Sequence, residues 1–279
     1  MGLQRYRNRT AGRECLFLLV ATAFCFPLYL LIAISLDSAR DVSASPLSIP
    51  SALHFDNYSV AWKTGGLGGL GNAFQSSLVI TVGSVVSVIA LGSICAYGIA
   101  RRRTRTMDAI YVLFVVGIIL PFQLATIPLY VAMRHLGLVG NYVGMIVLYT
   151  ALLMPLTVFL YTGFMRALPR DYEEAARVDG AGFLRTYLRV VFPLMRPVTG
   201  TVAVLAGLLV WNDFFFSLIF LAGSRYETLP VALYSFVGEY DSQWNLMFAA
   251  VAISIAPILA FYLFAQRHLV RGFTAGVKG

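Results

Sequence analysis

The sequence predicts an all-α membrane protein with six transmembrane helices. Of its 279 residues, 59% are hydrophobic and 12% are charged, and the mean hydropathy is +0.77. A chain of this length with so few charged residues is too apolar for a water-soluble domain. Its apolar residues form long continuous runs, whereas Lys and Arg cluster in the short segments between them. Together these observations indicate a helical protein that crosses the membrane several times.

The apolar runs predict where the helices lie. Five of them contain no charged residue, and each reaches the roughly 20 residues that a helix needs to cross about 30 Å of hydrocarbon. A sixth run is interrupted by one acid, Asp213. Because the runs are continuous rather than alternating, a β-barrel is disfavoured. The expected spans are about 15–36, 73–100, 107–133, 141–165, 195–224 and 242–266, with tails at 1–14 and 267–279 and a loop at 166–194.

The first span has an alternative interpretation as a secretory signal peptide, since basic residues precede it. Its apolar run of 22 residues is longer than the roughly 7–15 residues of a signal-peptide core, which favours a retained helix.

The basic residues predict the orientation. Seventeen of the 21 Lys and Arg residues lie in the two tails, in the loop after the second span, and in or just after the 166–194 loop, where Arg196 follows. The other four, on the opposite side, are Arg40, Lys63, Arg134 and Arg225. By the positive-inside rule, both termini and the 166–194 loop are therefore expected in the cytoplasm. Topology explains the net charge of +8, so nucleic acid is not an expected partner.

The 166–194 loop has the pattern of two short helices joined at a glycine turn. Asp171 stands three residues before Glu174, as an N-cap stands before a reciprocal acid, and Gly180 can supply the left-handed residue that ends a helix. This pattern predicts a helix over about 172–179. A second amphipathic helix is expected after Gly182, ending at Pro193. An interfacial helix lying on lipid headgroups would also explain the alternation of apolar and Arg faces.

A motif within this loop identifies a family. Glu174-Ala175-Ala176 is followed by Gly180, and then by Val190, Phe192 and Pro193. This frame resembles the EAA loop of binding-protein-dependent ABC importers, which reads Glu-Ala-Ala, three residues, Gly, nine residues, Ile-x-Leu-Pro. Val replaces Ile and Phe replaces Leu, and the spacing holds without a gap.

Looser patterns are similar to the carbohydrate-uptake branch of these permeases, the MalG-like subunits. They are Pro121-Phe122-Gln123, Trp211-Asn212-Asp213-Phe214, and the C-terminal Gln266, Gly272 and 274–279. The resemblance covers essentially the whole chain and implies the type I ABC importer permease fold with a cytoplasmic coupling-helix loop. It also implies a second homologous permease, most simply a different chain in a heterodimer, two ATPase subunits, and an external sugar-binding protein or lipoprotein.

The resemblance implies a location and a cycle. The chain is expected in a bacterial or archaeal plasma (inner) membrane, where ATP-driven closure of the ATPases, transmitted through the loop, would drive alternating access. ATP and Mg are expected on the partner ATPases, with no cofactor on this chain. The residues expected to contact the ATPase or to set that contact's geometry are Glu174, Ala175, Ala176, Asp179, Gly180 and Ala181.

Two further groups of residues are candidates for binding. Gln123, Trp211, Asn212 and Asp213 have the aromatic and polar chemistry of a sugar cavity. Alternatively, Asp213 and Trp211 lie near the outer interface, and Gln123 belongs to an ordinary kinked helix whose amide bonds a freed carbonyl. The outer-loop residues Tyr234, Phe236, Glu239 and Tyr240 are candidates for contact with the binding protein. Packing of that loop on the bundle explains them equally well.

The expected function is ATP-driven import of a mono- or oligosaccharide. An importer for a glycerophosphodiester, an amino acid or a peptide shares every mechanical feature, and a stand-alone secondary transporter is a further alternative, although the sequence shows no convincing internal repeat. The chain has no phosphate-binding loop of the Gly-x-x-x-x-Gly-Lys-Ser/Thr type. Its three histidines, His54, His135 and His268, are not spaced for a metal or for general-base catalysis. The sequence therefore predicts a transport subunit without catalytic, cofactor or metal residues.

Overall fold

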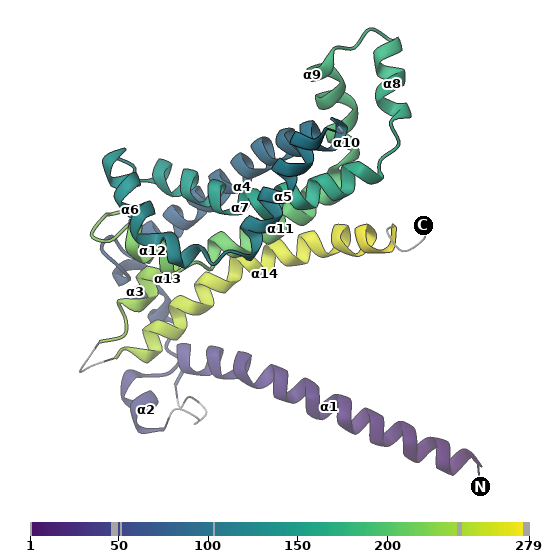
Figure 1. Cartoon of the computed structure of the whole chain (residues 1–279). Helices are drawn as coiled ribbons and strands as arrows, with labels where there is room; N and C mark the ends of the chain where they lie inside the picture. Colours follow the sequence, from purple (N-terminus) through teal and green to yellow (C-terminus); the bar gives the residue numbers. More distant parts are fainter. Residues whose placement is uncertain (1, 46–49, 51, 103, 239–241, 276–279) are drawn as a thin grey trace. The chain divides into compact units, whose positions relative to one another are not determined.

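The computed structural model describes residues 2–45, 50, 52–102, 104–238 and 242–275, with side chains described from Arg13 to Ala260 within those ranges. The described residues are helical almost throughout (Figure 1), and their only β-pairing is an isolated bridge between Val237 and Ser242. The all-α class expected from the sequence is thus confirmed.

The chain divides into two compact units. The first contains Met1–Gly71 and Ala232–Ala256, and the second contains Asn72–Val231 and Pro257–Gly279. The helices in chain order are α1 (Gly2–Ser35), α2 (Ala39–Ala44), α3 (Asp56–Thr64), α4 (Leu70–Arg101), α5 (Arg105–Ile119), η1 (Phe122–Ala125), α6 (Thr126–His135), α7 (Tyr142–Ala167), α8 (Asp171–Val178), α9 (Phe183–Thr186), η2 (Tyr187–Val191), α10 (Phe192–Leu194), α11 (Arg196–Trp211), α12 (Phe215–Phe220), α13 (Leu229–Tyr234) and α14 (Trp244–Ala275).

The first unit is held together by a buried asparagine. The side-chain amide of Asn57 in α3 donates hydrogen bonds to the carbonyls of Ser35 (3.0 Å) and Asp37 (2.9 Å), just after α1. Its own carbonyl oxygen accepts from the amide of Asn245 in α14 at 3.1 Å. Because buried polar groups are costly without partners, these bonds fix the ends of α1, α3 and α14 to one another.

The second unit is built on close contact between α4 and α7. Gly92 in α4 faces Thr157 in α7, and a Cβ atom on that glycine would come within 2.4 Å of the threonine methyl. Gly83 faces Ile146 in the same way. Small residues at such crossings let helix backbones approach closely in a membrane. Two buried apolar clusters flank this contact, one centred on Tyr97 and Tyr161 and the other on Leu148 and Phe220.

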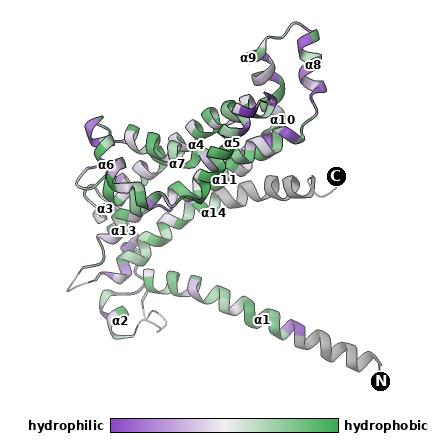
Figure 2. Cartoon of the chain, viewed as in Figure 1, coloured by the Kyte–Doolittle hydropathy of each residue, from purple (hydrophilic) through white to green (hydrophobic). Residues whose placement is uncertain are grey.

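The described residues contain three candidate spans, or up to five if each bent helix pair counts as one. Arg13–Ser35, Leu70–Arg101 and Tyr142–Ala167 are each long and apolar enough to cross a membrane. Two bent helix pairs, Arg105–Ile119 with Phe122–His135 and Phe183–Leu194 with Arg196–Trp211, qualify if each pair counts as one span. Helix α14 adds an apolar stretch at Trp244–Ala260. Hydrophobic residues cover the middle of α4, α5, α7 and α11, whereas hydrophilic residues gather on α8 (Figure 2).

The third expected span, 107–133, is not one kinked helix. Helix α5 ends at Ile119, and the chain turns by 93° before the next helical segment begins at Phe122. Pro121 causes the break, since it cannot donate a backbone hydrogen bond and disfavours helical geometry in the residue before it. Leu120 is accordingly extended, with φ −70° and ψ 128°. The carbonyl of Gln123 accepts from the Thr126 hydroxyl at 2.8 Å. The side chain of Gln123 itself is exposed.

The fifth expected span, 195–224, is also discontinuous. A 75° bend at the start of this range separates the segment ending at Leu194 from α11. Helix α11 then ends at Trp211, and a short irregular turn at residues 212–214 leads into α12. The sequence signal for this break within the span was the single acid of the run, Asp213.

Candidate functional site

Helix α8 begins one residue earlier than expected. It spans Asp171–Val178, its N-cap is Arg170, and no side chain caps it. The interpretation of Asp171 as an N-cap paired with Glu174 was therefore wrong. The start is instead fixed by Arg170, whose carbonyl accepts from the backbone of Glu173 (2.9 Å) and Glu174 (3.0 Å). The guanidinium of Arg170 in turn donates to the carbonyl of Arg101 at 3.3 Å. The acids in the first turn still face the positive end of the helix dipole.

Gly180 ends α8 as expected. Its φ of +79° lies in the left-handed region that favours glycine. Gly180 N–H donates to the carbonyl of Arg177 (3.0 Å), and Ala181 N–H donates to that of Ala176 (2.9 Å). This pair of bonds is the Schellman motif, which satisfies the last carbonyls of a helix and turns the chain sharply.

The inner side of α8 carries a buried carboxylate. Glu173 is only 4% exposed, and its Oε1 lies 2.6 Å from Nε of Arg101 at the end of α4. Its Oε2 accepts from the hydroxyl of Tyr97, one turn earlier in α4, at 3.1 Å. Besides Glu173, the only buried residue of α8 is Ala176. The inner side of α8 is therefore attached to α4 by an ion pair and a tyrosine hydrogen bond.

The outer side of α8 carries most of the residues that the motif predicts. Glu174, Ala175, Asp179 and Gly180 are exposed, whereas Ala176 is buried and Ala181 is half-buried. Val178 lies among the exposed residues and is itself 88% exposed. An exposed face that combines small side chains, one large apolar side chain and acids allows a second protein to approach its backbone closely.

The second half of the loop packs one apolar face on the bundle. Tyr187 and Val191 are buried, and the Tyr187 hydroxyl lies 2.6 Å from the Ser93 hydroxyl of α4. The Tyr97 ring contacts those of Tyr187 and Phe183, with centroid distances of 5.3 and 5.0 Å. The other face, with Leu184 and Leu188, is exposed.

This half of the loop does not stop at Pro193. Segment η2 is π-helical, with Phe192 N–H donating to the carbonyl of Tyr187 five residues back. The helix continues through Pro193 to Leu194. Pro193 is tolerated there because it occupies the first turn of α10, where a backbone N–H has no partner within the helix. The chain bends only after Leu194.

Asp213 serves as the acceptor at the start of α12. Its Oδ2 accepts hydrogen bonds from the backbone N–H groups of Phe216 (3.0 Å) and Ser217 (3.2 Å) and from the hydroxyl of Tyr149 in α7 (2.8 Å). A carboxylate with three donors at a helix start stabilises that helix and satisfies its free N–H groups. These contacts give Asp213 a structural role at the break in the fifth expected span.

We expect Asp213→Ala to lower the stability of the solubilised protein by about 1–2 kcal/mol, because three donors lose their acceptor. Asp213→Asn should stay close to the parent protein, since one amide oxygen can take the place of Oδ2. Thermal unfolding in detergent measures both variants. Asn212→Ala is the matched control, as the Asn212 amide donates to the carbonyl of Leu208, four residues earlier at the end of α11. A large loss of transport in a fully stable Asp213→Asn protein would contradict the structural role.

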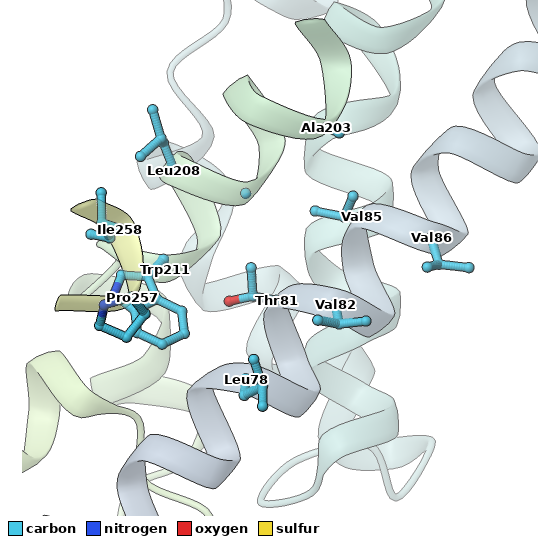
Figure 3. A pocket seen from close by; sticks show the side chains of 11 residues that line it. Leu78, Thr81, Val82, Val85, Val86, Ala203, Leu208, Trp211, Pro257 and Ile258 are labelled. Carbon is cyan, nitrogen blue, oxygen red and sulfur yellow. The ribbon is translucent and has the colours of Figure 1, made fainter. Parts of the chain in front are cut away.

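The candidate cavity residues do not share one pocket. Trp211 is buried and lines a cavity of about 260 Å³ between α4, α11 and α14 (Figure 3), but Asn212, Asp213 and Gln123 are not among its lining residues. The cavity is almost wholly apolar, with side chains that include Leu78, Val82, Val85, Ala203, Leu208 and Ile258. Such a lining suits hydrocarbon better than sugar hydroxyls. Asn212 and Gln123 are exposed.

The outer-loop candidates have different surroundings. Tyr234 is exposed, whereas Phe236 is 5% exposed and packs closely on Gly65. Phe236 is therefore a packing residue of the first unit. Glu239 and Tyr240 lie outside the described residues.

Sequence reasoning missed the buried carboxylate and its partners. Glu173 precedes the motif, and Arg101 was interpreted only as part of a basic run. A signal was present, because Glu173 and Ala176 lie three residues apart and so share one face of α8. Nothing in the sequence identified Tyr97 as a partner of Glu173, or Tyr149 as a partner of Asp213. Among the described residues, no group of three or more His, Cys, Asp or Glu side chains is placed to hold a metal.

Comparisons with known proteins agree on one family. The model of the family described as "binding-protein-dependent transport system inner membrane component" matches residues 88–275. The melibiose/raffinose/stachyose import permease protein MelC of Bacillus subtilis (strain 168) is 36% identical over 97% of this chain and 99% of its own length. The multiple sugar-binding transport system permease protein MsmG of Streptococcus mutans is 35% identical over 90% of each chain.

A solved structure shares the fold. A chain from the crystal structure of a bacterial ABC transporter, involved in the import of the acidic polysaccharide alginate, superimposes with a TM-score of 0.80 and 22% identity. The match covers 94% of this chain and 96% of the other.

Proposed function

Because this chain belongs to the family of binding-protein-dependent transport system inner membrane components, we propose that it moves a mono- or oligosaccharide across the membrane as one permease subunit of an ATP-driven importer. Members of the family are multi-pass inner-membrane permeases that work with ATPase subunits and a substrate-binding protein. The chain is accordingly a transport subunit and not an enzyme, and ATP hydrolysis belongs to the ATPases.

The proposal of a sugar as the solute rests on the relatives. The two permeases named above, which cover nine-tenths or more of the chain, carry sugars in their names. A third relative, 33% identical, is a probable permease for starch degradation products from Thermoanaerobacterium thermosulfurigenes. Three sugar permeases at this similarity favour a sugar over a phosphodiester, an amino acid or a peptide.

The single observation that carries the mechanism is the two-sided character of α8. One side is attached to α4 through Glu173, while the other exposes Glu174, Ala175 and Asp179. A helix so placed can dock on an ATPase and move with it, and its attachment passes the movement to the bundle. Closure of the ATPases would then open the solute pathway of the paired permeases toward the outside, and ATP hydrolysis would return it to the inward-open state.

The remaining assignments complete the proposal. Both termini and the 166–194 loop lie in the cytoplasm, in accord with the distribution of basic residues. The partner permease is a second, homologous chain. ATP and Mg bind to the ATPase subunits, and this chain binds no cofactor.

The test combines a pull-down with uptake. The chain is recovered from its native membrane in mild detergent, and its companions are identified by mass spectrometry; uptake of labelled mono- and oligosaccharides is measured with and without the gene. We expect a second permease, an ATPase and a binding protein, and loss of uptake of at least one sugar. Recovery of the chain alone would indicate a stand-alone transporter. Loss of peptide or amino acid uptake with all sugars unaffected would replace the proposed solute.

A further inference from the structure

The buried pair of Glu173 and Arg101 connects more than two residues. Besides the carboxylate, Arg101 donates to the carbonyl of Met165 (2.9 Å) and, more weakly, to that of Leu168 (3.5 Å), at the end of α7. The side chains of Arg101 and Glu173 are 11% and 5% exposed. One guanidinium thus joins α8, α4 and α7 at a point shielded from water, where charge interactions are screened little.

Helix α8 buries too little apolar surface to be held on the bundle without this ion pair. The only apolar side chain that α8 buries is the single methyl group of Ala176. Its large apolar residues Tyr172 and Val178 are exposed. A displacement of α8 away from the bundle is therefore resisted chiefly by directional bonds, two from the buried carboxylate of Glu173 and a longer, exposed one from Arg170 to the carbonyl of Arg101.

Stability alone does not account for a buried ion pair. The cost of removing two charges from water offsets much of their attraction, and well-packed apolar residues in their place are often as stable or more so. A charged pair differs from such a replacement in its fixed direction and distance. A contact of fixed direction and distance is useful where the movement of one helix must be passed to another.

We infer that Glu173 and Arg101 are positioning residues that pass the displacement of α8 to α4. This inference rests on the proposed function, in which an ATPase moves α8. Helix α4 is continuous over 32 residues, so a displacement of Arg101 at its last turn moves the whole helix. Breaking the pair should leave the ATPase bound and active but should separate its hydrolysis from movement of the solute.

The experiment uses the complete transporter in proteoliposomes, with the ratio of ATP hydrolysed to sugar imported as the readout. Glu173→Gln keeps the size of the side chain and an acceptor for Tyr97 but removes the charge. We expect this variant to raise the ratio at least about fivefold, within the usual range of coupling between sites, while the ATPase is still recovered with the complex.

A double variant distinguishes loss of coupling from misfolding. Glu173→Met with Arg101→Met leaves no unpaired buried charge, so the chain should assemble while lacking the pair. It should show the same raised ratio. The matched control is Asp108→Asn, which removes an exposed ion pair with Arg166 (3.3 Å) in the same region and should leave the ratio unchanged.

The outcomes separate the inference from the proposed function. An unchanged ratio in the assembled double variant would overturn the inference, as would failure of both Glu173 variants to assemble, since the pair would then serve folding alone. If the parent complex binds no ATPase or imports no sugar, the proposed function itself fails, and the parent measurement shows this independently of any variant.

Discussion

Reversing the charge of Glu174 is expected to release the ATPase from the transporter and to abolish uptake. Glu174 is exposed on the outer side of α8, so Glu174→Lys leaves the fold intact but presents a cation where the proposed partner meets an acid. We expect ATPase affinity to fall at least ~30-fold, or about 2 kcal/mol, because the change both removes a charged contact and adds a repulsive one. Recovery of the ATPase in a pull-down and sugar uptake by cells measure the effect.

The control for this prediction is Asp108→Lys. It reverses an exposed acid at the start of α5 and breaks only its exposed pair with Arg166. Normal ATPase recovery with Asp108→Lys, beside its loss with Glu174→Lys, would locate the contact on α8.

Gly180→Pro tests the geometry of the same surface. Proline fixes φ near −65° and lacks an N–H, whereas Gly180 has φ +79° and donates to Arg177. The substitution should therefore redirect α8 and uncouple transport while the protein remains in the membrane. Normal uptake by both the Glu174 and Gly180 variants would remove the docking assignment.

Adding one methyl group at Gly144 is expected to destabilise the protein severely. Gly144 lies in the first turn of α7, and a Cβ atom there would stand 1.6 Å from the carbonyl oxygen of Leu138. That oxygen belongs to the backbone, so neither the added methyl group nor the Leu138 carbonyl can relieve the overlap by a change of side-chain rotamer. We expect Gly144→Ala to cost about 3 kcal/mol or more and to reduce the amount of protein in the membrane. Thermal unfolding in detergent and immunoblots of membrane fractions measure these effects.

Helix α7 offers a matched control. Gly163 is exposed, and apart from its own turn of helix no atom of the described residues lies within 4 Å of a Cβ added to it. Gly163→Ala should therefore be neutral, or stabilising by up to about 1 kcal/mol through helix propensity. Equal stability of the two alanine variants would show that the turn at Leu138 adjusts freely, contrary to the expectation.

Helices long and apolar enough to cross a membrane could be expected from the sequence, because hydropathy depends on composition over about 20 residues. The breaks within them were less predictable because each depends on a single residue and its neighbours. Pro121 indicated a kink, but the size of the turn depends on the 3₁₀ segment that follows and on the bond from Thr126. Asp213 marked an irregularity, yet its role became clear only with Tyr149, which lies 64 residues away in the sequence.

The candidate site shows the same division. The local pattern predicted two short helices joined at Gly180, since a left-handed glycine acts on its own backbone. The inner contacts of α8 depend on Arg101 and Tyr97, more than 70 residues earlier in the chain. One sequence without their spatial arrangement could not pair them with Glu173. The cap proposed for Asp171 failed because the helix begins one residue earlier, with the backbone carbonyl of Arg170 accepting from Glu173 and Glu174.

The π-helical segment at Tyr187–Val191 has a consequence for the length of the chain. A π turn accommodates one residue more than an α turn, and here it keeps both Tyr187 and Val191 buried. Deleting a single residue would let the turn close as an α-helix, but it would rotate α9 by about 100° and shift it by about 1.5 Å along the axis. Phe183 would then leave the ring of Tyr97. Surface loops ordinarily tolerate insertions and deletions, but the stretch between Gly182 and Pro193 should accept substitutions far more readily than changes in the number of its residues.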